Sequence, residues 1–445
     1  MEIEQFKDES LAHYSYAIVS EGEMALIDPS RNPRQYYKFA EENKVKIVAV
    51  FETHPHADFV SGHLQIHQET GAIIYVSEKV GVNYPHEPFD EGNTVTIGKA
   101  IISPLHTPGH SPDSLTFVVE EGNKTVLFTG DTLFIGNVGR PDLREKAGNM
   151  KAKRVELAKA MYETIQTKFN SFADEVLIYP AHGAGSLCGK NIGTSSSTTL
   201  GNERMANWAF KKQTEEQFVE EILKDQSFIP SYFGFNVDLN RNGAGNVQQE
   251  KYRVPVSIAE DKVEDGITVV DVRPAESYKI GHLSNSINIM ARRGEDKYET
   301  WLGTIIRPNE PFYLVVNSVE DIDELLERTA KIGYENQMKG ILTLNSKAFI
   351  TPYNFNLEYF KNNLGAYTIV DVRNESEWTE DKIFDNSVEI PLNELRERIN
   401  EVPGNKPIVV HCAGGYRSAA GSSILENKFK DQKVFDLSEA IKDFK

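Results

Sequence analysis

The chain has 445 residues, a length typical of about three domains. Its 48 Lys and Arg residues against 66 Asp and Glu residues give a formal charge of -18 at pH 7, which argues against nucleic acid or an anionic membrane as a partner. There are two cysteines, Cys188 and Cys412, and the opening segment is acidic and polar, unlike a targeting signal. We therefore expect a cytoplasmic protein without a disulfide scaffold or a membrane segment.

Short strands and helical segments alternate through the first domain, which we place at residues 1–238. Apolar residues at helical spacing predict a helix over about 151–169. The stretch 236–252 is rich in Asn, Gly and Gln, and we place a linker at 239–254. Apolar runs bounded by turn residues predict strands over 16–20, 24–28, 45–53, 72–77, 100–106, 114–121, 124–131 and 174–182.

Beyond the linker the sequence repeats itself. The run "VVDVR" at 269–273 recurs as "IVDVR" at 369–373, one hundred residues later, and "YLVVNS" and "IVVHC" predict matching buried strands. Two copies of one α/β domain are therefore expected, at 255–345 and 352–445.

The stretch "ETHPHADFVSGH" places His54, His56 and Asp58 on alternate positions at the end of a predicted strand. Imidazole and carboxylate groups at strand ends suit divalent metal ions, so this pattern predicts a metal site. Further candidate ligands occur in the motifs HTPGH, FTGD and YPAHG, namely His110, Asp131 and His182. The other histidines considered are expected to be satisfied or exposed side chains: His13, His63, His67, His86, His106 and His282.

These motifs resemble the metallo-β-lactamase fold, whose marker THxHxDH corresponds to residues 53–59, with Phe59 in place of the last histidine. In the two-metal hydrolases of that family, such as hydroxyacylglutathione hydrolase (glyoxalase II), that histidine binds the second metal. The resemblance implies an αββα sandwich in which the second metal position is damaged, because Phe59 has no donor atom. Asp58, Asp131 and His182 remain, so a weak second ion is not forbidden.

A single metal changes the chemistry that is expected. Paired ions generate and hold a hydroxide for hydrolysis, whereas one iron with two histidines and one carboxylate leaves room for a sulfur and dioxygen. Zinc has no redox chemistry. The single-metal interpretation resembles the persulfide dioxygenases (the ETHE-type branch), which implies one Fe(II) per chain bound by His54, His110 and Asp131. The side chains expected to orient ligands and substrate, or to add further ligands, are His56, Asp58 and His182.

Residues that follow the ligand motifs are candidates for substrate contact. Arg140 lies in "GNVGRPDL", and the stretch after His182 resembles bacterial members of this branch. Lys190 and Arg204 in that stretch could pair with an anionic thiol substrate, although an ordinary surface charge is the alternative. Cys188 is a further candidate contact, although a small buried residue is the more frequent fate of a cysteine.

The stretch "IVVHCAGGYRS" is a predicted strand running into a glycine-rich loop and then a helix. Such a loop points backbone N–H groups inward, and the helix N-terminus adds partial positive charge. We therefore expect the pKa of the Cys412 thiol to be lowered, with Arg417 nearby, so that the loop can cradle an anionic persulfide. The cradle residues are expected to be Ala413, Gly414, Gly415, Tyr416 and Ser418.

This loop resembles the active-site loop of the rhodanese (sulfurtransferase) family. Four residues separate Cys412 from Arg417, one fewer than in phosphatase loops of similar form. The first repeat has Ser318 opposite Cys412 and Asp323 opposite Arg417, so it lacks a sulfur carrier and would repel an anion. We interpret it as a catalytically inactive rhodanese-homology domain.

The whole chain resembles the CstB-type fusions of a persulfide dioxygenase, a pseudo-rhodanese and a rhodanese. The resemblance implies oxidation of a low-molecular-weight thiol persulfide by O2 to sulfite, and transfer of a sulfane sulfur from Cys412 to sulfite to give thiosulfate, as in sulfide detoxification. We also expect a homo-oligomer, either a dimer or a tetramer. The alternatives are a zinc-dependent glyoxalase II-type thioester hydrolase fused to a sulfurtransferase, and a non-catalytic sulfur carrier or sensor.

Overall fold

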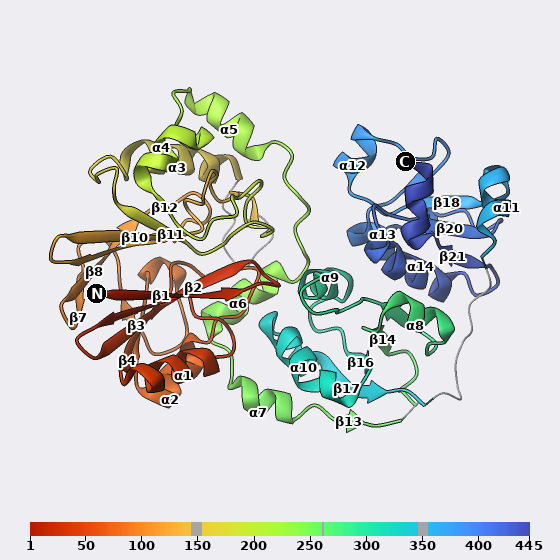
Figure 1. Ribbon diagram of the computed structural model, residues 1–445, viewed down its shortest axis with the longest axis horizontal. Coiled ribbons are helices and arrows are strands. Elements are labelled where there is room, and N and C mark those ends of the chain that lie inside the picture. Colours follow the sequence, from red (N-terminus) through yellow and green to blue (C-terminus); the bar gives the residue numbers. More distant parts are fainter. Residues whose placement is uncertain (144–153, 260–261, 346–354) are drawn as a thin grey trace. The chain divides into compact units, whose positions relative to one another are not determined.

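The structure is a computed structural model, and it divides into two units that are described here in turn (Figure 1). It describes four stretches of the chain: 1–143, 154–259, 262–345 and 355–445. Residues 1–250 with 330–333 form the first unit, and residues 251–329 with 334–445 form the second.

The first unit contains two six-stranded sheets, and together they include all eight predicted strands. One sheet runs in the order of the sequence: β1 (Glu2–Asp8), β2 (His13–Ser20), β3 (Glu23–Ile27), β4 (Lys46–Phe51), β5 (Ile73–Val76) and β6 (Glu87–Pro88). The order of the other sheet is β12 (Thr198–Thr199), β11 (Leu177–Pro180), β10 (Lys124–Gly130), β9 (Leu115–Glu121), β8 (Ala100–His106) and β7 (Val95–Ile97). Strand β1, which the sequence analysis did not predict, adds a half-buried edge through antiparallel pairing with β2.

The two sheets pack face to face and share one apolar core. The rings of Phe51 in β4 and Phe117 in β9 have centres 5.4 Å apart, and those of Tyr16 in β2 and Phe128 in β10 are 4.9 Å apart. In each strand every second residue points inward, and these residues from both sheets together form such a core.

Helices cover the outer face of each sheet and complete the predicted αββα sandwich. Helices α1 (Arg34–Asn43) and α2 (His63–Thr70) bury Tyr36 and Ile66 against the first sheet, whereas α3 (Arg154–Thr167) and α5 (Glu215–Leu223) bury Met161 and Phe218 against the second. The unit also contains α4 (Leu200–Ala206) and α6 (Phe233–Asn242), whereas α7 (Val247–Tyr252) begins in this unit and ends in the second. The stretch interpreted as a linker therefore includes helix, and its role as a domain boundary stays a prediction.

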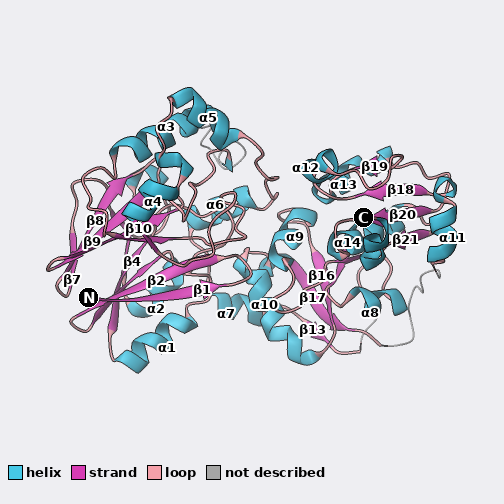
Figure 2. Ribbon diagram, turned by 45° about the horizontal axis from the view of Figure 1, so that its top comes forward, coloured by secondary structure: helices cyan, strands magenta, loops and turns pink. Residues whose placement is uncertain are grey.

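The second unit contains two parallel sheets, one in each repeat (Figure 2). The first has the order β13 (Val256–Ser257), β17 (Met338–Thr343), β16 (Phe312–Val316), β14 (Thr268–Asp271) and β15 (Ser286–Asn288). The second has the order β19 (Val388–Glu389), β18 (Thr368–Asp371), β20 (Ile408–His411) and β21 (Val434–Asp436). The helices are α8 (Ala275–Ile280), α9 (Tyr298–Ile305), α10 (Ile322–Lys331), α11 (Leu357–Asn362), α12 (Glu375–Glu380), α13 (Leu392–Arg398) and α14 (Tyr416–Lys428).

The recurring DVR motif has the same local structure in both repeats. In each copy the aspartate ends a buried strand and pairs with the arginine two residues later, at 2.6 Å for Asp271 and Arg273 and 2.7 Å for Asp371 and Arg373. The repeats are thus two α/β domains of one kind, as predicted.

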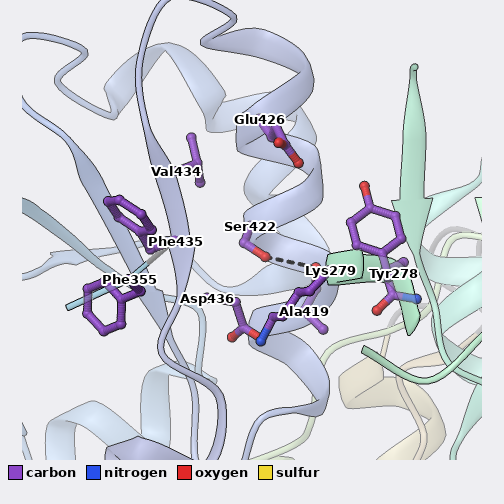
Figure 3. A pocket seen from close by; sticks show the side chains of 10 residues that line it. Tyr278, Lys279, Phe355, Ala419, Ser422, Glu426, Val434, Phe435 and Asp436 are labelled. Carbon is purple, nitrogen blue, oxygen red and sulfur yellow. Dashed lines mark hydrogen bonds and ion pairs between the residues drawn. The ribbon is translucent and has the colours of Figure 1, made fainter. Parts of the chain in front are cut away.

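The two repeats dock through α14 of the second repeat and α8 and β15 of the first. The Asn288 N–H donates to Ser423 Oγ at 3.0 Å, and Lys279 Nζ lies 2.7 Å from a carboxylate oxygen of Asp436. A pocket of about 270 Å³ opens at this junction, with Lys279 and Asp436 meeting across it and Glu426 on α14 (Figure 3).

Candidate functional site

Four of the six predicted ligands follow directly on the ends of strands in the first unit. His54 and His56 come after β4, Asp131 comes after β10 and His182 comes after β11. His110 lies in the loop between β8 and β9. All of these side chains are buried, at no more than 3% exposure, so their polar atoms must be satisfied inside the protein.

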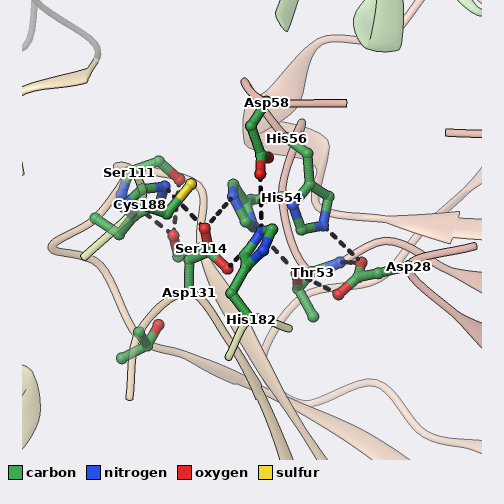
Figure 4. A network of polar contacts seen from close by, with 12 residues as sticks. Asp28, Thr53, His54, His56, Asp58, Ser111, Ser114, Asp131, His182 and Cys188 are labelled. Atoms are coloured by element: carbon green, nitrogen blue, oxygen red, sulfur yellow. Dashed lines mark hydrogen bonds and ion pairs between the residues drawn. The ribbon is translucent and has the colours of Figure 1, made fainter. Parts of the chain in front are cut away.

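The first group of converging side chains comprises His54, His110 and Asp131. Asp131 Oδ2 lies 3.5 Å from His110 Nε2 and 3.8 Å from His54 Nε2 (Figure 4). The other ring nitrogen of each histidine is held from behind: His54 Nδ1 lies 3.0 Å from Thr53 Oγ1, and His110 Nδ1 lies 2.9 Å from the Arg140 carbonyl oxygen. Such contacts fix the ring so that Nε2 faces a metal ion.

The spacing in this group fits a metal ion. Two ligands about 2.1 Å from one ion are separated by about 3.0 to 3.4 Å in octahedral or tetrahedral geometry, slightly less than the observed distances. Among the described residues, no group lies in hydrogen-bonding geometry with either oxygen of Asp131. A buried carboxylate without donors is costly, and a cation between Asp131 and the two imidazoles would remove that cost.

Gly139 brings the loop after Asp131 close to this group. A Cβ atom at residue 139 would lie 1.9 Å from the Asp131 carbonyl oxygen and 3.0 Å from His110 Nδ1. Only glycine fits there, which explains the "GNVGRPDL" motif as a packing requirement.

Asp58 and His182 form a second polar pair beside the first group. His182 Nε2 lies 3.4 Å from Asp58 Oδ2 and 3.6 Å from Asp131 Oδ1. Burial opposes ionisation of both side chains, but the opposite charges outweigh it: the pKa of Asp58 falls to about 2, and Asp58 and Asp131 raise the pKa of His182 to about 10. Without a metal, the His182 proton therefore supplies the positive charge that these carboxylates require.

The Phe59 ring packs on the rings of His13 and His56, and a ring nitrogen of His56 lies within 4.8 Å of ligand atoms of Asp131 and His182. The Phe59 ring centre lies 3.9 Å from that of His13 and 4.4 Å from that of His56. His56 Nε2 lies 3.3 Å from Asp28 Oδ1, and burial, which lowers the pKa of His56, is outweighed by Asp28, which raises it. His13, expected to be satisfied or exposed, is instead a buried part of this cluster.

Asp28 is a site residue that the sequence analysis missed. Its carboxylate accepts hydrogen bonds of 2.8 Å from both the N–H and the hydroxyl of Thr53, as well as facing His56. It therefore fixes the strand end from which His54 and His56 project. The only indication of this role in the sequence is weak, because Asp28 simply ends an ordinary apolar strand, "MALID".

The three basic candidates for substrate contact are engaged in structural contacts. Arg140 is 1% exposed, pairs with Asp142 through two hydrogen bonds of 2.7 Å and donates to the Ser227 carbonyl. Lys190 donates to the carbonyl oxygens of residues 221 and 224, and Arg204 pairs with Asp174 and donates to two carbonyls of the chain before it. The guanidinium of Arg140 thus holds this loop together, and its contact with substrate stays a prediction.

Cys188 lies beside the metal-binding groups. Its side chain is 1% exposed, and burial together with the charges of Asp58 and Asp131 raises the pKa of its thiol well above the usual value. Its sulfur is within 4.8 Å of ligand atoms of Asp58 and His182.

The glycine-rich loop of the second repeat has the predicted form. Strand β20 ends at His411, Cys412 follows, and α14 begins at Tyr416. The Gly415 N–H lies 3.1 Å from Cys412 Sγ, and Gly415 has a φ of 107°, which favours glycine. The N–H group thus points at the sulfur, as a cradle for an anion requires.

Arg417 has a partner that the sequence analysis missed. Glu377 on α12 accepts hydrogen bonds of 2.5 and 2.8 Å from its guanidinium. The pKa of Glu377 is lowered because Arg417 and other donors outweigh burial. Glu377 therefore holds the arginine beside the Cys412 loop and offsets its charge.

The loop after β16 in the first repeat is organised differently, and the strand register corrects the expected alignment: Val316, not Ser318, lies opposite Cys412. Ser318 Oγ donates to Asp321 at 3.0 Å, and the same carboxylate accepts from the Ser318 N–H. A carboxylate therefore caps this helix where the second repeat points an N–H at a sulfur. This geometry agrees with the prediction that the first repeat has no sulfur-transfer chemistry, which stays a prediction.

Comparison with known families identifies the kinds of domain. The Metallo-beta-lactamase superfamily profile matches residues 10–182, and the Rhodanese-like domain profile matches 256–340 and 356–445. No helix in the described stretches combines the length and apolar character needed to cross a bilayer.

Comparison with individual proteins gives relatives of two kinds. The cytoplasmic hydroxyacylglutathione hydrolase of Arabidopsis thaliana is 35% identical over 134 residues, 29% of this chain and 52% of that protein. The mitochondrial persulfide dioxygenase ETHE1 of Bos taurus is 25% identical over 219 residues, 49% of this chain and 78% of that protein. The chain thus spans about half the length of the plant relative.

One solved structure matches most of the chain. The crystal structure of a metallo-beta-lactamase from Staphylococcus aureus subsp. aureus COL is 31% identical, with a TM-score of 0.69. The match covers 77% of this chain and 99% of that one.

Proposed function

The chain belongs to the metallo-beta-lactamase superfamily and carries two rhodanese-like domains, and from this premise we propose that it is a persulfide dioxygenase coupled to a sulfurtransferase. The proposed substrate is a low-molecular-weight thiol persulfide, RSSH. With O2 and water it would yield RSH, sulfite and two protons. A Cys412 persulfide and sulfite would then yield the Cys412 thiol and thiosulfate. The proposed setting is sulfide detoxification in the cytoplasm.

The observation that carries the proposal is the pairing of His54, His110 and Asp131 with Phe59. Two imidazoles and one carboxylate converge in a buried group, while the motif position that would add another imidazole has a phenyl ring packed on His13. A site with two histidines and one carboxylate suits non-haem iron, which keeps open positions for substrates.

The metal proposed for this group is one Fe(II) per chain. Bound there, Fe(II) would supply the redox chemistry that lets dioxygen oxidise a sulfur atom, which zinc does not supply. The protein's part is to hold the ligands. The Arg140 carbonyl and Thr53 hydroxyl orient His110 and His54, and the burial of the group keeps bulk water away.

The second step is assigned to the Cys412 loop. In the proposed transfer, Cys412 Sγ carries the sulfane sulfur, and the Gly415 N–H lies where it can stabilise negative charge on the sulfur chain. Arg417, held by Glu377, would offer positive charge to the approaching sulfite. Sulfite attacks the outer sulfur, the S–S bond breaks, and the electron pair stays with Cys412 as thiolate.

The alternative is a zinc-dependent thioester hydrolase of the hydroxyacylglutathione hydrolase kind. It is favoured by relatives of that name, which match this chain as well as the persulfide dioxygenases do. Phe59 and the fused Cys412 loop count against it.

A substrate comparison on one enzyme preparation separates the two readings. Full-length protein carrying one Fe(II) is offered glutathione persulfide in one assay and a glutathione thioester in the other. The proposal predicts uptake of O2 matched by sulfite plus thiosulfate in the first assay, and no hydrolysis above background in the second. Rapid thioester hydrolysis without oxygen uptake would establish the alternative.

A further inference from the structure

Arg417, beside the Cys412 loop, shares its positive charge with a carboxylate of the same repeat. Its Nη1 and Nη2 donate to the two carboxylate oxygens of Glu377 at 2.5 and 2.8 Å. Among the described residues, Glu377 is the one carboxylate within ion-pair distance of Arg417. Two parallel hydrogen bonds of this kind are also the way in which arginine binds an anionic ligand. Glu377 therefore occupies donors that an anionic acceptor of sulfur would use.

The Glu377 carboxylate is also held by its own helix, α12. One of its oxygens accepts a hydrogen bond of 2.9 Å from the Asn374 N–H, the contact that a Glu or Gln makes at this position of a capping box. Burial raises the pKa of Glu377, but the hydrogen bonds from Arg417 and the Asn374 N–H lower it by more. The side chain is therefore ionised at neutral pH and places a fixed negative charge against the arginine.

The two repeats show that this ion pair is not a requirement of the fold. With the DVR motifs aligned, helices α8 and α12 correspond residue for residue, and Ser277 of the first repeat stands opposite Glu377. The loop after β16, residues 317–324, contains no arginine either. The repeat that lacks the loop arginine thus also lacks the acid, and the pair accompanies Cys412.

The ion pair lies partly out of water, where charges act more strongly than at an open surface. The side chains of Arg417 and Glu377 are 15% and 31% exposed. Arg373, which also acts on Glu377, is itself neutralised by Asp371 at 2.7 Å. A change in the charge of residue 377 is therefore expected to change strongly how Arg417 attracts an anion.

We propose that Glu377 determines which acceptor takes the sulfane sulfur, because its carboxylate competes with anionic acceptors for Arg417. The inference rests on the proposed function and deepens it. Sulfite, a dianion, must compete with Glu377, whereas a neutral acceptor need not. In either transfer the acceptor's lone pair forms a bond to the outer sulfur, the S–S bond breaks, and the electron pair stays on Cys412. Glu377 thus sets how the sulfur is divided between anionic and neutral acceptors.

Glu377→Gln separates the charge from the fold. Glutamine also serves in a capping box, so its side-chain oxygen can still accept from the Asn374 N–H. With an effective dielectric constant of about 40 and a separation of about 6 Å, losing one negative charge strengthens binding of a monoanion roughly 10-fold and of a dianion roughly 100-fold. The matched control is Glu375→Gln: Glu375 is exposed on the same helix, and Arg417 pairs with Glu377 rather than with it.

Two alkylating reagents test the competition without any turnover. Reduced full-length protein is treated with iodoacetate, an anion, or with iodoacetamide, which is neutral and of nearly the same size, and labelling of Cys412 is followed by peptide mass spectrometry. We expect Glu377→Gln to raise the ratio of the two rates roughly 10-fold and Glu375→Gln to leave it unchanged. The difference should shrink at high salt. The ratio cancels changes in thiol pKa or loop access, which a merely structural role would produce.

Single-turnover sulfur transfer gives the second measurement. Protein loaded with glutathione persulfide without oxygen is desalted and mixed with increasing sulfite, or with tris(hydroxymethyl)phosphine, a neutral acceptor that becomes a phosphine sulfide. In Glu377→Gln the half-saturating sulfite concentration should fall at least roughly 10-fold, and the rate with the phosphine should stay within about twofold.

An unchanged or lower alkylation ratio in Glu377→Gln, or equal changes with sulfite and phosphine, would overturn the proposal. Wild-type protein that passes sulfur to neither acceptor would contradict the proposed function instead, and the alkylation ratio would still decide whether Glu377 governs the access of anions to Cys412.

Discussion

His411 is expected to make the second repeat sensitive to mild acid. It ends β20 immediately before Cys412, is fully buried, and packs its ring 5.0 Å from the ring of Phe384. Burial lowers its pKa to about 4, because Asp371, at 3.7 Å, only partly offsets the loss of hydration. The neutral imidazole is therefore the form that the fold accommodates.

The size of the effect follows from the two pKa values. An unfolded histidine titrates near pH 6.5, so on acidification the unfolded state takes up a proton before the folded state does. The contribution of His411 is therefore fully present above about pH 6.5 and is lost progressively as the pH falls to about 4. A separation of about 2.5 pH units is worth about 3 kcal/mol of unfolding free energy.

The assay compares urea unfolding of the wild type and His411→Asn at pH 7 and at pH 4, followed by tryptophan fluorescence, to which Trp378 in the same repeat contributes. The strand register places Val315 at the corresponding position of the first repeat, so the fold already accommodates an uncharged side chain there. We expect the wild type to lose about 3 kcal/mol more than the variant between the two pH values. Equal losses in both proteins would refute the argument that His411 is buried in its neutral form.

Three further results are expected. Cys412→Ser should shift the product from thiosulfate to sulfite, whereas Ser318→Ala, a change in the loop of the first repeat, should leave the product ratio unchanged. An unaltered thiosulfate yield in Cys412→Ser would exclude that cysteine as the carrier. Asp131→Asn should weaken metal binding by at least roughly 100-fold and abolish oxygen uptake. The same variant should keep sulfur transfer by Cys412, measured in an assay with thiosulfate and cyanide. Loss of both activities would show that the sites are not independent. Tyr416→Phe removes a hydroxyl that donates to the Met290 carbonyl at 2.9 Å. Urea unfolding should therefore show a loss of about 1–3 kcal/mol in the free energy of unfolding. An unchanged midpoint would mean that this hydrogen bond contributes nothing to the docking of the two repeats.

The fold was predictable where the sequence carries strong local patterns. The apolar runs of β2, β3, β4, β8, β9, β10 and β11 each form a strand, and the DVR motif correctly indicated two domains of one kind. Strand β1 was missed because Glu2–Asp8 is an acidic edge strand that is only half-buried. Helices α6 and α7 were missed because Asn, Gly and Gln are typical of loops, and packing overrides such preferences.

The candidate site was predictable where ligands belong to motifs at strand ends. His54, His110 and Asp131 do converge, since strands that end at one edge of a sandwich bring their following residues together. What could not be predicted depends on contacts between distant segments. Arg140 donates a hydrogen bond to Ser227, and Arg417 donates to Glu377, which lies 40 residues away in the sequence. No local sequence pattern predicts either pair.

The central claim is that an iron bound by His54, His110 and Asp131 oxidises a thiol persulfide. The most direct test is oxygen uptake by metal-free protein reloaded with Fe(II) without oxygen, then given glutathione persulfide, beside a sample reloaded with Zn²⁺. The account predicts uptake with Fe(II), matched by sulfite and thiosulfate, and none with Zn²⁺. Equal inactivity of both samples toward glutathione persulfide would contradict it.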